Sequence, residues 1–200
     1  MPQYISFDDT HVIYDLSDPF GIVAVHFSLL PIYLMVFYTS WFVVTREIEP
    51  VVAVGGQLAN DVLNKLLKVM FKQPRPDFHR LFGAQSHALS YGMPSAHAQF
   101  MGFFAAYYIA MTWAATSSCK AWKLLVTLGL TVAAVGVTIS RWYLMYHTVE
   151  QVLVGVGAGV AAGLWYALVS ISVREIGLVD WVLLWRVVRL FWIKDLYYHN

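Results

Sequence analysis

A polar connection enters a long apolar helix at residues 93–104, which read MPSAHAQFMGFF. Proline, serine and histidine stand where this helix begins, and a helix start offers unpaired backbone N–H groups and a positive dipole end to an anion. His97 falls in the first turn, beside the anion position. A serine followed by a histidine at a helix start is common by chance, so the function of this stretch depends on what the chain places next to it.

The composition is that of an integral membrane protein. Of the 200 residues, 59% are hydrophobic and only 12% are charged, and the mean hydropathy is +0.60. A soluble domain carries about twice that share of charge. We therefore expect one membrane-embedded domain over residues 1–200, with the lipid bilayer as its surroundings. The net charge of +1 and the lack of a basic run give no indication of nucleic acid binding.

Five apolar stretches predict membrane-spanning helices, since about 20 helical residues cross the hydrocarbon core. Their predicted limits are 19–44, 51–71, 94–116, 123–143 and 147–173. Pro31 lies inside the first stretch and predicts a kink or a break. In the last stretch, glycines at four-residue spacing predict a closely packed neighbouring helix: Gly155, Gly159 and Gly163. Residues 1–18 are expected to be a polar, mostly extended lead-in.

The C-terminal tail, residues 174–200, holds a shorter apolar segment at 179–193 that Arg186 and Arg189 interrupt. Fifteen helical residues reach only about 22 Å, which is short of the membrane core. This segment therefore predicts an interfacial amphipathic helix, with a short sixth span as the alternative. The expected fold class is all-α, a polytopic transmembrane helical bundle of five spans plus this segment.

Alternating spans bring four helix ends to one side of the membrane. These ends carry cationic, hydroxyl and imidazole side chains: Lys68, Arg75, Ser95, His97, Ser140, Arg141 and His147. Guanidinium groups bind phosphate oxygens in pairs, and a neutral imidazole can act as a nucleophile. Phosphoryl transfer needs mainly positioning and charge stabilisation. The sequence places no cluster of carboxylates on this side that could bind a metal, so we expect neither a metal nor a cofactor.

Three blocks of this set resemble the signature motifs of the type 2 phosphatidic acid phosphatase superfamily. They read Lys68-x6-Arg75-Pro76, Pro94-Ser95-Ala96-His97 and Ser140-Arg141-x5-His147. The resemblance covers residues 51–173. It implies that His147 attacks phosphorus to form a phosphohistidine, and that His97 protonates the leaving group and then activates water. It also implies a phosphate-binding set: Lys68, Arg75, Ser95, Arg141 and the backbone of Ala96.

Two positions depart from the superfamily pattern. Ala96 replaces a glycine, which is harmless if the residue lies in the first helical turn, as we expect. Gln151 replaces the aspartate that orients the nucleophile, and an amide accepts a hydrogen bond from the ring without supplying charge. Glu150, one turn from His147, and Asp61 in the second helix are the alternative orienting groups. Asp61 also has a simpler interpretation as an ion pair within its own helix.

The segments GMPSAHAQFMGF and SRWYLMYHTVEQVLVG resemble the dolichyl-diphosphatase branch, and FDDTHVIYD and QPRP its fungal members. This resemblance implies hydrolysis of dolichyl diphosphate to dolichyl phosphate and inorganic phosphate, which recycles the lipid carrier of protein N-glycosylation. A leaving phosphate is more acidic than an alcohol, which fits a neutral group at Gln151. The alternatives are a broader lipid phosphate phosphatase acting on monoesters and a non-catalytic lipid-phosphate binder.

The connection at 77–93 is long enough to be a lid or binding element. Arg80 could reach the second phosphate or simply be solvated, and His79 with His87 lacks a third ligand for a metal.

The orientation of the protein in the membrane is predicted from the lysines and arginines that have no expected role in catalysis. Three lie on the motif side and seven on the other: Arg46, Lys120, Lys123, Arg174, Arg186, Arg189 and Lys194. Positive charge favours the cytosol, so the motif side is expected to face away from it. For the branch named, this implies the endoplasmic reticulum membrane with the active site facing the lumen.

Overall fold

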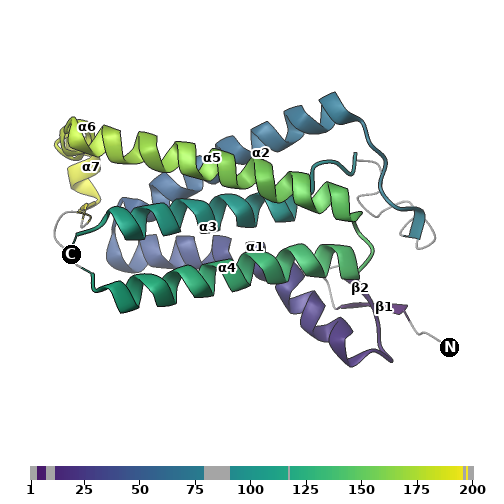
Figure 1. Ribbon diagram of the computed structural model, residues 1–200. Helices are drawn as coiled ribbons and strands as arrows, with labels where there is room; N and C mark the ends of the chain where they lie inside the picture. Colours follow the sequence, from purple (N-terminus) through teal and green to yellow (C-terminus); the bar gives the residue numbers. More distant parts are fainter. Residues whose placement is uncertain (1–3, 8–11, 79–90, 117, 196, 198–200) are drawn as a thin grey trace.

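Five long helices form an elongated bundle in the computed structural model, which describes residues 4–7, 12–78, 91–116, 118–195 and 197 (Figure 1). They are α1 (Pro19–Thr45), α2 (Glu49–Phe71), α3 (Ala96–Ala114), α4 (Lys120–Tyr143) and α5 (Val149–Glu175). The all-α prediction is confirmed. By length and composition α1, α4 and α5 can each cross a membrane, so this is a multi-pass membrane protein. Of the other two, α2 carries a charged stripe and α3 is enclosed by the other helices.

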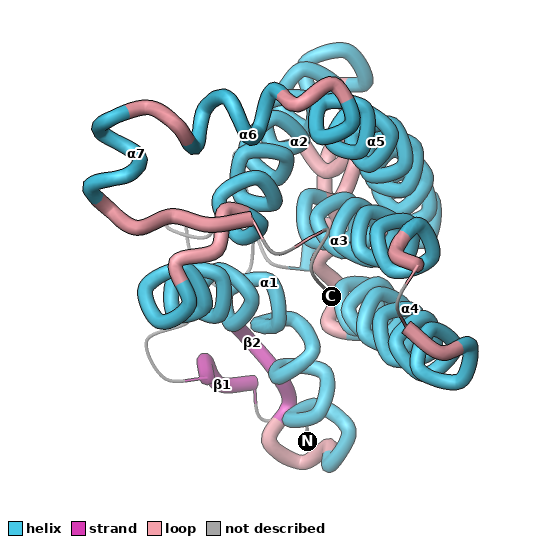
Figure 2. The backbone as a smooth tube through the Cα atoms, turned by 90° about the vertical axis from the view of Figure 1, so that its left-hand side faces the viewer, coloured by secondary structure: helices cyan, strands magenta, loops and turns pink. Residues whose placement is uncertain are grey.

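Figure 2 shows α3 in the middle of the bundle, with the other four long helices around it. Three of the glycines of α5, Gly155, Gly159 and Gly163, bring its backbone against α3. A Cβ atom added at Gly155 would lie 2.7 Å from the backbone carbonyl oxygen of Ser95. One added at Gly159 would lie 2.1 Å from the backbone carbonyl oxygen of Gln99. No side chain fits there, so the close packing predicted from the glycine spacing is confirmed.

The N-terminal lead-in contains two extended segments that form a hairpin. β1 (Tyr4–Phe7) pairs antiparallel with β2 (Val12–Asp15). The backbone N–H of Ile13 donates to the Tyr146 hydroxyl at 3.1 Å, which joins the hairpin to the turn between α4 and α5. Pro31 does not divide α1, although the helix changes direction along its length (Figure 1).

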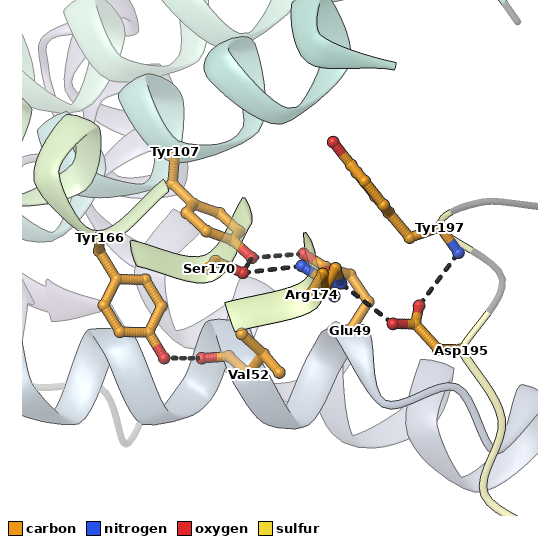
Figure 3. Close-up of polar contacts among 8 residues, drawn as sticks. All are labelled: Glu49, Val52, Tyr107, Tyr166, Ser170, Arg174, Asp195 and Tyr197. Carbon is orange, nitrogen blue, oxygen red and sulfur yellow. Dashed lines mark hydrogen bonds and ion pairs between the residues drawn. The ribbon is translucent and has the colours of Figure 1, made fainter. Parts of the chain in front are cut away.

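The apolar segment at 179–193 is neither one continuous helix nor a sixth span, whereas its interfacial position stays a prediction. Two short helices lie there, α6 (Leu178–Leu183) and α7 (Arg186–Leu190), and neither can cross a membrane. The chain then returns to the bundle, where Arg174 is buried between Glu49 at 2.5 Å and Asp195 at 3.0 Å (Figure 3). Tyr107 also donates to Glu49, at 2.8 Å. This ion cluster joins the end of the tail to α2 and α5.

Candidate active site

The end of α2, the start of α3, the end of α4 and the start of α5 meet at one end of the bundle. Asn64 donates from its side chain to the Pro94 carbonyl at 3.3 Å. The Ser95 N–H donates to the Gln151 carbonyl at 3.0 Å, and the His147 N–H to the Arg141 carbonyl at 3.2 Å. These contacts join the helix ends that carry the three sequence blocks.

Arg141 is a buried cation with an unused donor. It is 5% exposed, its Nη1 donates to the Ser28 hydroxyl at 2.6 Å, and its guanidinium lies 3.9 Å from the centre of the Tyr146 ring. Within the described ranges its Nε atom has no hydrogen-bond partner, and no carboxylate forms an ion pair with it. A buried charge is costly unless an opposite charge compensates it, so this position is suited to an anion.

Ser95 and the first turn of α3 supply neutral donors beside it. Ser95 is fully buried, and its hydroxyl neither caps the helix nor finds another partner in the part of the chain that is described. The first N–H groups of a helix have no intrahelical partner, which makes this an anion-binding position. Ala96 is the first helical residue and does not have a positive φ, so alanine is unstrained there, as expected.

His147 lies between α4 and α5 and is 3% exposed. Its Nδ1 lies 3.1 Å from Gln151 Oε1. An amide oxygen only accepts, so Nδ1 carries the proton and Nε2 keeps its lone pair. Burial, and after it the positive charges of Arg141, Arg75 and Lys68, lower the pKa of His147 to about 3, although the bond to Gln151 acts in the opposite direction. The imidazole is therefore neutral at physiological pH, as a nucleophile requires.

The remaining cations and His97 surround the same point. Burial also lowers the pKa of Arg75, although its guanidinium stays protonated at neutral pH. The charges of Arg141, Arg75 and Lys68 act on His97 as well as on His147, and His147 also acts on His97. Five of the residues expected at the site therefore form one group.

The alternative orienting residues lie elsewhere. Glu150 is exposed and makes no hydrogen bond to His147 in the described structure. Asp61 pairs with Lys65 at 2.7 Å on α2, as its simpler interpretation predicted. The buried Ser140 hydroxyl donates to the carbonyl of residue 137 at 2.7 Å, which is a local helix contact. Gln151 alone of these contacts His147.

A cavity of about 380 Å³ opens beside His97 between α1, α2 and α3. Its walls are mostly apolar on the α1 side and carry amides on the α2 side. The lining residues are Pro31, Ile32, Met35, Gln57, Asn60, Asp61, Asn64, Ala96, His97, Gln99 and Phe100. Its size is typical of a ligand pocket. The proposed roles of His79, Arg80 and His87 fall on residues 79–90, which lie outside the described residues.

The PAP2 superfamily model matches residues 50–173, which contain all three blocks. The chain belongs to the PAP2 superfamily. It is 40% identical over 200 residues to "Dolichyldiphosphatase" of Saccharomyces cerevisiae, covering 98% of this chain and 83% of that protein. It is 33% identical over 197 residues to "Dolichyldiphosphatase 1" of Homo sapiens, covering 93% and 79%.

A solved structure shares the PAP2 fold. The transmembrane PAP2 type phosphatidylglycerolphosphate phosphatase from Bacillus subtilis superposes with a TM-score of 0.64 at 22% identity, covering 79% of this chain and 80% of that chain. At this identity the likeness concerns the arrangement of helices.

Several residues that shape this PAP2 site were not predicted. Ser28 and Tyr146 hold Arg141. No local pattern marks Ser28, which lies 113 positions from Arg141 in the sequence. Gln99 bonds a neighbouring helix, as its polar side chain two residues beyond His97 indicates: it accepts from Asn64 at 2.8 Å and donates to Asn60 Oδ1 at 2.9 Å, which joins α3 to α2. One missed signal was readable: TVEQ at 148–151 is a capping box, and it starts α5 at Val149 rather than at residue 147.

Proposed function

We propose that this protein hydrolyses dolichyl diphosphate to dolichyl phosphate and inorganic phosphate, which recycles the lipid carrier for protein N-glycosylation. The observation that carries the proposal is the buried Arg141 guanidinium, whose Nε has no hydrogen-bond partner among the described residues. It lies with the unused Ser95 hydroxyl and the neutral His147 at one helix-end cluster. The names of the relatives at 40% and 33% identity support the substrate.

In this mechanism His147 Nε2 attacks the terminal phosphorus. A nitrogen–phosphorus bond forms and the bond to the bridging oxygen breaks, so dolichyl phosphate departs with a proton from His97. His97 then takes a proton from water, which attacks the phosphohistidine and releases inorganic phosphate. Arg141, Arg75 and Lys68 offset the charge of the phosphoryl group, and Ser95 with the α3 N–H groups binds its oxygens. Gln151 holds the Nδ1–H tautomer of the nucleophile.

The cavity between α1, α2 and α3 supports a substrate with an apolar chain. His97 lines it and His147 does not. A lipid chain in the cavity would place the departing lipid phosphate beside His97, the proposed acid, and the terminal phosphorus toward His147. From Asn64 to Gln57 the cavity follows seven residues of α2, or about 10 Å. The isoprenoid units next to the diphosphate fit this length.

The proposed location is the endoplasmic reticulum membrane, with the site facing the lumen. The excess of cations at the opposite end of the bundle supports this orientation. The apolar α1, α4 and α5 support integration in a membrane.

Purified protein in detergent tests the function. We expect phosphate release from dolichyl diphosphate in the presence of EDTA, faster than from phosphatidate, and a phosphoenzyme that is labile in acid and stable in base. His147→Ala should abolish both, whereas His26→Ala, at an exposed position of α1, should match wild type. Turnover by His147→Ala would show that His147 is not the nucleophile, and loss of activity in EDTA would exclude metal-free catalysis. Equal turnover of phosphatidate would favour the broader lipid phosphate phosphatase. Binding of lipid phosphate without turnover would identify a non-catalytic binder.

A further inference from the structure

The side-chain amide of Gln151 makes contacts in two directions. Its Oε1 lies 3.1 Å from His147 Nδ1 and accepts from the Thr148 N–H at 3.3 Å. Its Nε2 donates to the Pro74 carbonyl at 2.8 Å and to Gln73 Oε1 at 3.2 Å. A backbone N–H can only donate and a backbone carbonyl can only accept, so the neighbours determine which end of the amide is which.

Both ends of the connection between α2 and α3 meet at this amide. The Gly92 N–H donates to the Gln73 carbonyl at 2.7 Å. A Cβ added at Gly92 would lie 2.7 Å from both Nε2 and Oε1 of Gln151, so the chain passes directly over the amide. Arg75, which binds phosphate in the proposed function, follows Pro74 directly in the chain. One amide therefore connects the nucleophile to the segment that carries a phosphate-binding cation.

We propose that Gln151 is a positioning residue that couples the orientation of His147 to the seating of the segment at 73–75. When this segment is seated, Pro74 and Gln73 hold the amide with its oxygen toward His147, and Nε2 of the ring points to the phosphate. When the segment moves away, the amide loses two acceptors and the ring loses its fixed partner. The inference rests on the proposed function, because it assigns a positioning role within the same site.

This coupling explains why an amide occupies the position. Glutamate at 151 could still accept from His147 and Thr148, and it would complete the α5 capping box as well as glutamine does. It could not donate to Pro74 or Gln73, and its second oxygen would face two other acceptors at hydrogen-bond distance. Glutamate or glutamine at 151 would therefore cap α5 equally well, whereas donation to Pro74 and Gln73 requires the amide of glutamine.

Three variants separate these roles in kinetics with dolichyl diphosphate. Gln151→Glu keeps the acceptor for His147 and loses both donors, so we expect KM to rise about tenfold with a smaller fall in kcat. Its carboxylate raises the His147 pKa, so the acid limb of kcat/KM moves to higher pH. Gln151→Met loses both functions, and kcat should fall about a hundredfold or more. Gln73→Ala alone should lower kcat/KM about fivefold, and adding it to Gln151→Met should lower kcat/KM no further.

Proteolysis tests the coupling without relying on turnover. Lys72 is exposed, and trypsin cleavage after it, identified by fragment mass, reports whether the segment at 73–75 is seated. We expect faster cleavage in Gln151→Glu, Gln73→Ala and Gly92→Ala than in wild type. Gly157→Ala is the matched control, since a Cβ there meets nothing within 4 Å, and it should be cleaved at the wild-type rate.

The results separate the two proposals. Unchanged KM and unchanged cleavage after Lys72 in Gln151→Glu would overturn the coupling, even if His147→Ala is inactive. Additive losses in the double variant of Gln73 and Gln151 would overturn it too. An inactive wild type with accelerated cleavage in the three variants would instead refute the proposed function and leave the coupling supported.

Discussion

A methyl group added at Gly159 tests whether the close approach of α5 to α3 holds the active site together. The new Cβ would lie 2.1 Å from the Gln99 carbonyl oxygen, and ordinary contact begins at 3.4 Å. The obstacle is backbone, which cannot turn aside as a side chain can. The two helices would have to separate locally by the difference, about 1.3 Å (3.4 − 2.1).

The expected magnitudes follow from this displacement. Overpacking costs about 1–3 kcal/mol, and replacing glycine by alanine inside a helix returns about 1 kcal/mol. Gly159→Ala should therefore lower the free energy of unfolding by up to about 2 kcal/mol. Gln99 lies two residues from His97, and misplacing a catalytic group by about 1 Å costs about 100-fold in rate. We thus expect a large loss of kcat in a protein that still folds.

Gly157→Ala is the matched control, two residues away on the open side of α5. It gains helix propensity without a clash, so its stability should be equal or higher and its activity unchanged. The assay combines thermal unfolding in detergent with phosphate release from dolichyl diphosphate. Wild-type activity and an unchanged unfolding midpoint in Gly159→Ala would refute the reasoning from backbone contact.

Three further predictions concern charge and hydrogen bonding. Because the pKa of His147 is lowered from 6.5 to about 3, the native state binds fewer protons than the unfolded chain between these values. His147 therefore reduces stability as pH falls from 6.5 toward 3, and His147→Asn should flatten the fall of the unfolding midpoint measured between about pH 7 and pH 4.5. Ser28→Ala removes the partner of Arg141 Nη1 at 2.6 Å, so KM should rise about tenfold or more; an unchanged KM would show that this bond does not place the guanidinium. Arg174→Met leaves the Glu49 carboxylate buried without its cation, which should cost about 3–5 kcal/mol in thermal unfolding, and adding Glu49→Gln should recover part of that loss.

The helices and the side of the bundle that holds the motifs could be read from the sequence, because both depend on local order. Apolar runs of membrane length mark the helices, and alternation of direction brings the four polar helix ends together. At the C-terminal tail this reasoning predicted one helix, whereas the structure has two short helices, α6 and α7. Beyond its apolar run at 179–193 the tail returns to Arg174, which binds Asp195 and also Glu49, residues 21 and 125 positions away.

Local sequence also specified the chemistry of the site, since the three blocks carry the cations and both histidines wherever the chain places them. It left three candidates for the group that orients His147. The structure places Gln151 beside His147, and its amide is held by Pro74 and Gln73, which lie 77 and 78 positions away. The Ser28 contact to Arg141 spans 113 positions. A helical repeat follows from neighbouring residues, but partners that far apart meet only when α1, α2, α4 and α5 have packed around α3.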